Sequence, residues 1–296
     1  MSEFIYESAM SRNLGFMSEE EQDMLRNSSV AIAGAGGDGG MLAIQLARLG
    51  VGEMKLADPD PFEIENLNRQ AACTMDTLNV NKAVAVGEYV QRINPDLKVS
   101  LYTNGITREN TAEFVSGTDL VIDETEFTIH SLGVSLAREA RKANVPNLMA
   151  MNIGFGATVT SFHPKGKTFE ASLGLSEKAS LDEIDSTEVS IGKWLPYIPP
   201  YGDIRVLEKV ASGEKSAPSI APGVAIAAGI AASQALLHLT KGINNRPEPI
   251  YSPRVLVMDA MTGQGKIVRQ TGLSYARHAA VMALRSKLGK NPQASY

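Results

Sequence analysis

Polar residues that could bind a nucleotide are concentrated between Asp58 and Lys82. Asp58 follows a short apolar run, and its carboxylate is placed to accept hydrogen bonds from ribose hydroxyls. The groups after it suit a phosphate chain, because amide, guanidinium and ammonium groups donate hydrogen bonds to phosphate oxygens. These groups belong to Asn66, Arg69, Gln70 and Lys82, and a second acid, Asp60, precedes them. NAD does not need this second polar cluster, which indicates a nucleotide with a reactive triphosphate.

A strand–turn–helix–strand unit precedes these residues and would hold them in place. Residues 30–33 form an apolar run typical of a buried strand, and residues 41–49 alternate at helical spacing until Gly50 ends the helix. A second strand is expected at residues 53–57. The turn has the form G-x-G-x-x-G, and its glycines are Gly34, Gly36, Gly37 and Gly39. The backbone N–H groups of such a turn and the helix N-terminus favour a bound phosphate.

Lys82 lies in the first turn of a helix expected over residues 80–93. A positive charge there opposes the helix dipole, at a cost of a few tenths of a kcal/mol to about 1 kcal/mol. A bound anion at the same end would offset that cost. A surface lysine is the ordinary alternative, but the polar cluster just before Lys82 favours a phosphate-binding lysine.

Acidic residues follow the fourth expected strand, residues 119–123, which comes after a third at residues 97–102. The acids are Asp123, Glu124 and Glu126. Ligands of open parallel sheets lie outside the carboxyl ends of the strands, and Mg²⁺ prefers oxygen ligands and bridges phosphates. The pattern therefore indicates a magnesium site, with simple solvation of the strand end as the alternative.

The order of these blocks resembles the ThiF/MoeB family, which includes the ubiquitin-activating enzymes. The blocks are G-x-G-G-x-G, D-x-D, N-L-N-R-Q and a lysine that opens a helix, and the resemblance extends from about Ser11 to about Gly263. It implies ATP-dependent adenylation of a substrate carboxylate with release of pyrophosphate, with ATP and Mg²⁺ as cofactors. Residues implied to bind the nucleotide are Gly34, Gly36, Gly37, Gly39, Asp58, Asp60, Asn66, Arg69, Gln70 and Lys82. The implied catalytic residues are Arg12, Arg69 and Lys82.

The metal ligand implied by the resemblance is Glu126. The family pattern at this place is D-x-T-D, and its second Asp holds the metal. This chain has Asp-Glu-Thr-Glu over residues 123–126. Glutamate keeps the charge but adds one methylene, so Asp123 or Glu124 remains an alternative ligand.

Arg12 is implied to act between subunits. Family members carry an arginine at this place that reaches the triphosphate in the neighbouring subunit of a dimer, so a homodimer is expected. Arg12 precedes Ser18-Glu19-Glu20-Glu21, a capping box expected to open a helix that ends near Arg26. A solvated surface arginine is the alternative.

The chain as a whole is predicted to adopt an α/β fold. We expect a Rossmann-like, doubly wound, mostly parallel sheet with added antiparallel strands in the C-terminal part. The expected divisions are an N-terminal helical arm (1–27), a ThiF-type adenylation domain (28–270) and a C-terminal helix (271–296). Further expected helices are 129–143 and 217–240, and further strands are 147–151, 154–162, 251–259 and 265–269. A polar, proline-rich crossover segment, residues 165–218, is expected to be irregular; the resemblance implies that it lies over the nucleotide and guides the tail of the substrate.

The composition narrows the remaining possibilities. The chain has 296 residues, of which 44% are hydrophobic, and its net charge of -5 argues against a nucleic-acid-binding surface. The single cysteine, Cys73, excludes a disulfide framework and a four-thiolate zinc site, so we expect no zinc and a cytoplasmic location. Cys73 itself is interpreted as a small buried hydrophobe. The N-terminus lacks signal-peptide features, and residues 220–239 are interpreted as a core helix rather than a membrane span.

Two other functions stay open. An NAD-dependent oxidoreductase is supported by the glycine turn and Asp58, but it has no use for Arg69 together with Lys82. A non-catalytic ThiF-like binding subunit is left open by Glu126. If the protein adenylates a carboxylate, that substrate carboxylate could belong to a small carrier protein, a peptide or a metabolite. The acyl-adenylate would then pass to a separate nucleophile such as sulfide, an amine or a thiol.

Overall fold

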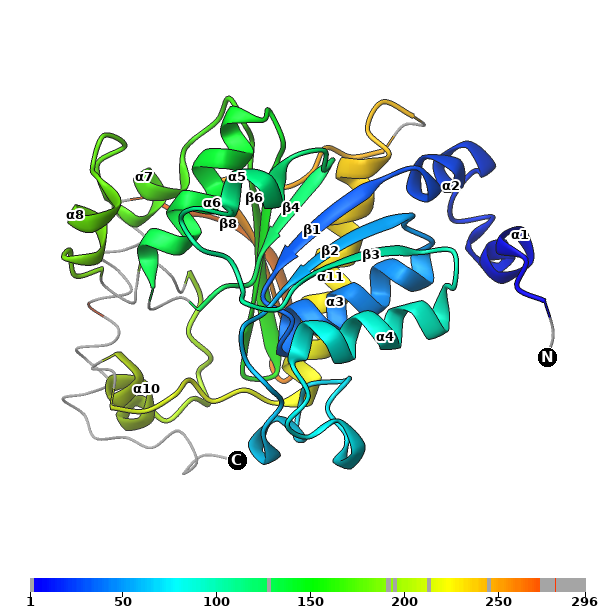
Figure 1. Ribbon diagram of the computed structural model, residues 1–296. Coiled ribbons are helices and arrows are strands. Elements are labelled where there is room, and N and C mark those ends of the chain that lie inside the picture. Colours follow the sequence, from blue (N-terminus) through cyan, green and yellow to red (C-terminus); the bar gives the residue numbers. More distant parts are fainter. Residues whose placement is uncertain are drawn as a thin grey trace.

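The computed structural model describes residues 3–126, 129–189, 193, 196–211, 214–243, 246–271 and 280. Its centre is one eight-stranded sheet with the strand order β3-β2-β1-β4-β5-β6-β7-β8 (Figure 1). The first five strands in this order, β3, β2, β1, β4 and β5, are parallel to one another. Strands β6, β7 and β8 are added by antiparallel pairing. The predicted mixed sheet is therefore confirmed. The strands are β1 Ser29–Ala33, β2 Glu53–Ala57, β3 Lys98–Tyr102, β4 Leu120–Asp123, β5 Asn147–Ile153, β6 Gly156–Phe162, β7 Arg254–Asp259 and β8 Gln264–Arg269.

Strand β1 shows how the sheet is buried on both faces. Val30 and Ile32 belong to one hydrophobic core, and Ala31 and Ala33 belong to another. Helices α3, α4 and α11 close the first core, and α5 and α6 close the second from the opposite face (Figure 1). A continuous apolar run is what a central parallel strand covered on both faces requires. The helices are α3 Gly37–Leu49, α4 Lys82–Ile93, α5 Thr111–Val115, α6 His130–Lys142 and α11 Ala221–Leu239.

The N-terminal arm packs against the end of α3 that lies away from the glycine turn. It consists of α1 Tyr6–Met10, the 3-10 helix η1 Ser11–Asn13 and α2 Glu19–Arg26. Ser18 and Glu21 form the predicted capping box. Tyr6 Oη donates a 2.6 Å hydrogen bond to the carbonyl of Gly50, the residue that ends α3. The buried Glu21 carboxylate accepts bonds of 2.6 and 2.8 Å from Arg246, which ties the arm to the segment after α11.

The crossover segment contains more helix than the sequence indicated. The expectation of an irregular segment was wrong for its described part, which includes α7 Phe169–Leu173, α8 Leu181–Asp185 and α10 Ile204–Ala211. Helices of five residues such as α7 and α8 produce little periodicity, whereas α10 has eight residues, is amphipathic and was missed. Helices α7 and α8 nevertheless begin with caps that the sequence displays, because Thr168 and Ser180 each accept a hydrogen bond from the backbone N–H three residues later.

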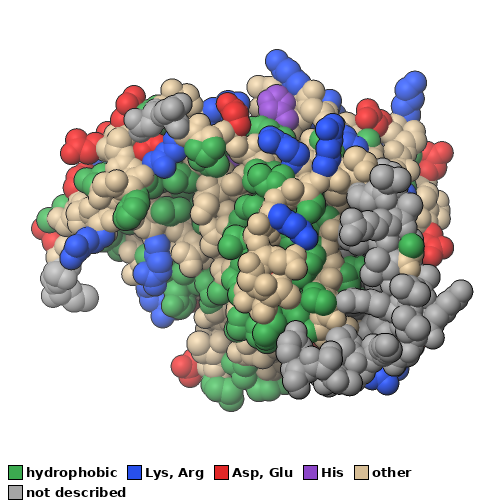
Figure 2. Space-filling view, turned by 180° about the vertical axis from the view of Figure 1, so that it is seen from behind, with side chains coloured by type: hydrophobic (Ala, Val, Ile, Leu, Met, Phe, Trp, Pro, Cys, Tyr) green, Lys and Arg blue, Asp and Glu red, His purple; other side chains and the backbone are tan. Residues whose placement is uncertain are grey.

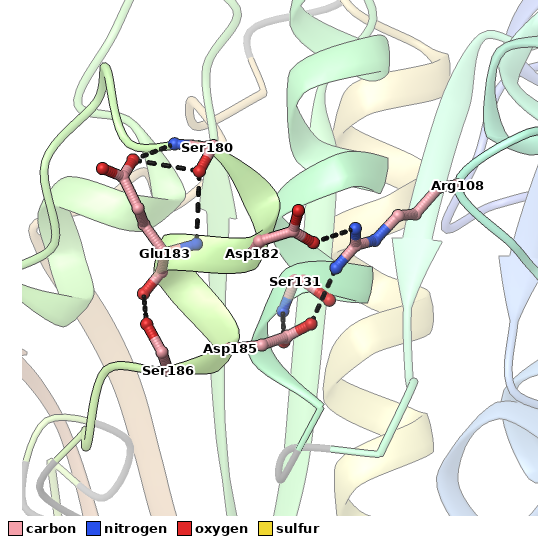
Figure 3. Close-up of polar contacts among 7 residues, drawn as sticks. All are labelled: Arg108, Ser131, Ser180, Asp182, Glu183, Asp185 and Ser186. Carbon is pink, nitrogen blue, oxygen red and sulfur yellow. Dashed lines mark hydrogen bonds and ion pairs between the residues drawn. The ribbon is translucent and has the colours of Figure 1, made fainter.

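Helix α8 is fixed to the rest of the domain by charged contacts. The Arg108 guanidinium lies between Asp182 and Asp185, at 2.5 and 2.8 Å (Figure 3). Asp185 also accepts a 3.2 Å hydrogen bond from the backbone N–H of Ser131, at the start of α6 (Figure 3). These contacts hold the first part of the crossover segment against the helices that cover one face of the sheet.

Helix α11 is the small-residue helix predicted for residues 217–240. Among the described residues it is the one helix long and apolar enough to cross a membrane by length and composition, and half of that apolar stretch is buried in the protein. It packs against α3, β5 and β6, which supports its interpretation as a core helix. On the side of the molecule opposite to that of Figure 1, hydrophobic side chains gather in the middle of the surface (Figure 2). The predicted C-terminal helix, residues 271–296, lies outside the described residues except for positions 271 and 280.

Candidate nucleotide-binding site

The predicted site lies at the carboxyl ends of the parallel strands. The glycine turn follows β1, Asp58 follows β2, and the acidic run begins at the last residue of β4. Because β1 pairs with both β2 and β4, these three strand ends are neighbours. In chain order the strands β1, β2 and β3 extend the sheet to one side of β1, and β4 then continues it on the other side. Ligands of open α/β sheets bind in the crevice at such a reversal of strand order.

Two glycines of the turn are required by close packing, and two leave space. Gly34 has a φ of +98°, and a Cβ at this position would lie 2.2 Å from the carbonyl oxygen of Glu124. A Cβ at Gly39 would lie 1.9 Å from the carbonyl oxygen of Gly34. At Gly36 and Gly37 the nearest atoms belong to side chains, and none is closer than 3.4 Å. This second pair is where a phosphate can approach the start of α3.

Asp58 and Asp60 have different environments. The buried Asp58 carboxylate accepts hydrogen bonds from the N–H groups of Ala35 at 2.8 Å and Asp60 at 3.0 Å, and burial raises its pKa. The Asp60 side chain is 64% exposed, and its Oδ2 lies 3.0 Å from Lys82 Nζ. Asp58 therefore shapes the glycine turn, while Asp60 presents a carboxylate to the ligand side.

Lys82 is the first residue of α4, as predicted, and its N-cap is Asn81. The Lys82 side chain is only 12% exposed, and its backbone N–H donates a 2.9 Å bond to the carbonyl of Asp60. The Asp60 carboxylate supplies a negative charge at the helix start, so it offsets the dipole cost of Lys82 even before an anion binds.

The Asn66–Gln70 turn follows the 3-10 helix η2, Ile64–Asn66. Asn66 is buried, and its Oδ1 accepts a 3.0 Å bond from the N–H of Glu63. Gln70 is also buried, and its side-chain amide lies next to the glycine turn, with Nε2 3.6 Å from the Cβ position of Gly36. Gln70 Oε1 is buried and has no hydrogen-bond partner among the described residues; as an amide oxygen it can accept a bond from a ligand hydroxyl, whereas only Nε2 can donate to a phosphate oxygen.

Arg69 is anchored on one side only. Its Nη1 donates to the carbonyl of Glu65 at 3.1 Å and to Asn68 Oδ1 at 2.9 Å. Within the described residues no hydrogen bond reaches its Nε or Nη2. Asn68 Nδ2 in turn donates a 3.0 Å bond to the carbonyl of Ser219, just before α11. The remaining guanidinium N–H groups can therefore meet phosphate oxygens.

Asp38, inside the glycine turn, was missed by the sequence analysis. Its Oδ2 accepts bonds of 2.9 and 2.8 Å from the backbone and side-chain nitrogens of Asn152, whereas Oδ1 is buried and lacks a partner among the described residues. Burial raises the pKa of the Asp38 carboxyl to about 6, against the lowering effect of the Asn152 bonds. The sequence did contain a signal for Asp38. It places an acid at one of the x positions of the G-x-G-x-x-G motif, and a negative charge there would repel a bound phosphate.

The acids after β4 differ in how many of their oxygens are already used. Asp123 Oδ1 accepts bonds from the N–H and hydroxyl of Thr125 at 3.1 and 2.7 Å. Glu124 Oε1 accepts a 3.0 Å bond from the N–H of Ala150, and burial, with the nearby Asp38 charge, raises the pKa of Glu124 well above its usual range. Glu126 is exposed. Among the described residues no three His, Cys, Asp or Glu side chains form a metal-binding group.

Arg12 lies far from the glycine turn of its own chain. The next residue, Asn13, donates bonds to Gln22 Oε1 at 3.0 Å and to the carbonyl of Leu49 at 3.4 Å, at the C-terminal end of α3. Helix α3 has 13 residues, which corresponds to about 20 Å. An arginine side chain does not span that distance, so Arg12 could complete a nucleotide site only in another subunit.

Cys73 is buried in the main hydrophobic core, in agreement with its interpretation as a small hydrophobe. Its thiol donates a weak 3.7 Å bond to the carbonyl of Glu63, and burial raises its pKa. Both features disfavour the thiolate that a nucleophilic cysteine needs.

The sequence is similar to those of two adenylyltransferase- and dehydratase-named proteins. The MOCS3 adenylyltransferase and sulfurtransferase of Dictyostelium discoideum is 26% identical over 251 residues, which is 85% of this chain and 51% of that protein. The tRNA threonylcarbamoyladenosine dehydratase of Bacillus subtilis is 32% identical over 153 residues, 51% of this chain and 59% of that protein. The chain thus spans between about half and six tenths of the length of these relatives.

Solved structures share the fold, and a family model covers most of the sequence. E. coli MccB crystallised with ATP aligns with a TM-score of 0.67 at 21% identity, over 88% of this chain and 70% of that chain. PaaA aligns with a TM-score of 0.62 at 21% identity, over 84% of this chain and 66% of that chain. The model of the ThiF family matches residues 10–276. This match spans nearly the whole chain, and the protein belongs to the ThiF family.

Proposed function

We propose that this protein uses ATP to adenylate a substrate carboxylate and releases pyrophosphate. The observation that carries the proposal is the meeting of the glycine turn with two cationic groups, Arg69 and Lys82, at one edge of the sheet. A dehydrogenase binding NAD needs the turn and an acid but not this cationic pair. Membership of the ThiF family and the adenylyltransferase name of the MOCS3 relative support the same activity.

The reaction needs little covalent chemistry from side chains, because the substrate carboxylate itself attacks the α-phosphorus and the bond to pyrophosphate breaks. The protein contributes position and charge. Arg69 and Lys82 stabilise the negative charge that moves to pyrophosphate. Asn66 and Gln70 bind the phosphate chain. The exposed carboxylate of Asp60 accepts hydrogen bonds from the ribose.

Asp58 contributes to the same site by shaping it. Its carboxylate receives the N–H groups of Ala35 and Asp60, which holds the glycine turn close to the Asp58–Asp60 segment. The nucleotide can then contact Gly36 and Gly37 with its phosphates and Asp60 with its ribose at the same time.

Mg²⁺ is part of the proposal, with Glu126 as its ligand. Mg²⁺ in nucleotide enzymes is held by one or two carboxylates together with phosphates and water, and Glu126 is the exposed acid of the run after β4. One oxygen of Asp123 and one of Glu124 already accept hydrogen bonds within the chain. When bound, Mg²⁺ would neutralise part of the phosphate charge.

The substrate carboxylate is proposed to belong to a peptide or a small carrier protein, with a metabolite as the remaining option. MccB has been crystallised with MccA, and the MOCS3 relative is also named a sulfurtransferase. A sulfur or amine nucleophile is therefore a suitable acceptor of the acyl-adenylate. The proposal includes a homodimer, supported by the distance of Arg12 from its own site, and a cytoplasmic location, supported by the single cysteine.

The test is exchange of labelled pyrophosphate into ATP, with Mg²⁺ and a panel of peptides and small carboxylates. Lys82→Ala should lower the exchange rate by roughly 10²-fold, as loss of one charge-stabilising group commonly does. Lys98→Ala, which removes an exposed lysine on β3, is the matched control and should keep the rate. Normal exchange by Lys82→Ala would refute its role. Stoichiometric binding of NADH without binding of ATP would replace the proposal with an oxidoreductase.

A further inference from the structure

A continuous series of hydrogen bonds connects the glycine turn with Arg69. Asp38 Oδ2 accepts a 2.8 Å bond from Asn152 Nδ2. Asn152 Oδ1 accepts a 2.9 Å bond from the hydroxyl of Ser219. The carbonyl of Ser219 accepts a 3.0 Å bond from Asn68 Nδ2, and Asn68 Oδ1 accepts a 2.9 Å bond from Arg69 Nη1. We name this series the Asp38–Arg69 relay.

The relay joins segments that are distant in sequence. Asp38 and Asn152 are 114 positions apart, and Asn68 and Ser219 are 151 apart. The segments are the start of α3, the end of β5, the residues that enter α11 and the Asn66–Gln70 turn. Each asparagine donates on one side and accepts on the other, which fixes the orientation of both amides.

The crossover segment contacts the β5–β6 turn, which follows Asn152 at the end of β5. The hydroxyl of Tyr201 accepts a 2.8 Å bond from the N–H of Phe155 and donates a 3.0 Å bond to Asp259 Oδ2. Tyr197 donates a 2.9 Å bond to the same carboxylate oxygen. The second half of the crossover segment is therefore attached to the turn at Phe155, and the relay to Arg69 begins three residues earlier, at Asn152.

We propose that Asn152 and Ser219 are positioning residues for Arg69 and set how the arginine meets the triphosphate. This inference rests on the proposed nucleotide function. The physical reason is that Arg69 has two anchors, the Glu65 carbonyl and the Asn68 amide. Asn68 is exposed, and its bond to Ser219 is what restrains it. A guanidinium fork must be oriented correctly to contact phosphate oxygens through more than one N–H.

The experiment measures the dissociation constants of ATP and AMP by titration calorimetry. Ser219→Ala removes the bond to Asn152 and should weaken ATP roughly 3- to 10-fold, the range for one hydrogen bond. AMP lacks the terminal phosphates that Arg69 would hold, so its affinity should not change. Ser219→Thr keeps a hydroxyl and should restore ATP binding. Ser233→Ala is the control, because among the described residues the hydroxyl of Ser233 bonds only to the carbonyl of Gly229 within α11.

A double-mutant cycle separates this inference from the proposed function. In an Arg69→Ala background, Ser219→Ala should change the affinity for ATP by less than about twofold, because its effect passes through the missing arginine. Multiplicative effects, or equal weakening of AMP, would overturn the positioning role and leave the proposed function intact. Unchanged ATP affinity in Arg69→Ala alone would overturn the positioning role, whereas the proposed function is tested separately by pyrophosphate exchange. If Ser219→Ala does not fold, Asn68→Ala breaks the next bond of the relay from an exposed position, with the same expectations.

Discussion

Asp38→Asn tests the electrostatics of the glycine turn. In the folded protein the pKa of Asp38 is raised from 3.8 to about 6 by burial. A raised carboxyl pKa means that the folded state binds a proton more tightly than the unfolded state. The protonated side chain therefore stabilises the fold at low pH, and this stabilisation is lost as the pH rises from about 4 to above 6. At pH 8 the buried carboxylate costs its full penalty.

The magnitude follows from the two pKa values. A difference of about two units corresponds to about 3 kcal/mol between the low-pH and high-pH limits. At pH 5, below the folded pKa, about half of that stabilisation is present, and at pH 8 none remains. Asn accepts the two Asn152 bonds through Oδ1 and carries no charge. The stability of Asp38→Asn relative to the natural protein should thus be roughly 1 to 2 kcal/mol more favourable at pH 8 than at pH 5.

The assay is urea unfolding of both proteins at pH 5 and pH 8, because groups common to both cancel in the difference. The charge of Asp38 also raises the pKa of Glu124, so the variant relieves a second group in the same direction. Asp76→Asn, at an exposed position in the 3-10 helix η3 Met75–Thr77, controls for the change in net charge. A stability difference that is the same at both pH values, or a variant that is less stable at pH 8, would refute the reasoning.

Three further predictions concern assembly, metal content and the thiol. Arg12→Ala and Lys82→Ala should each be inactive, and co-expression should restore activity, because one site of the mixed dimer holds Lys82 of one chain and Arg12 of the other; confirmed heterodimers without activity would contradict the shared site. Elemental analysis of the purified protein should find no zinc, since one cysteine and four histidines lack the usual ligand spacing; one zinc per chain would contradict this. Cys73→Ala should keep pyrophosphate exchange, and a folded but inactive variant would give the thiol a catalytic role.

Local patterns in the sequence determined the frame of the site. The apolar run of β1 predicted a buried strand, and the glycine motif predicted the tight turn into α3. The Ser18 capping box and the first-turn position of Lys82 were also correct. These features depend on residues within a few positions of one another, so backbone sterics and side-chain periodicity are enough to reveal them. The five-residue helices α7 and α8 of the crossover segment lacked such periodicity and were missed, and the amphipathic α10 was missed as well.

Only the tertiary structure decided how the polar groups are distributed within that frame. It directs the Asp58 carboxylate to backbone N–H groups of the turn and leaves Asp60 beside Lys82. It also brings Asn152 to Asp38 across 114 positions of sequence. No local rule predicts such partners. The strands that carry them are distant in sequence and become neighbours only in the folded sheet, where their ends determine which polar atoms are buried and hydrogen-bonded.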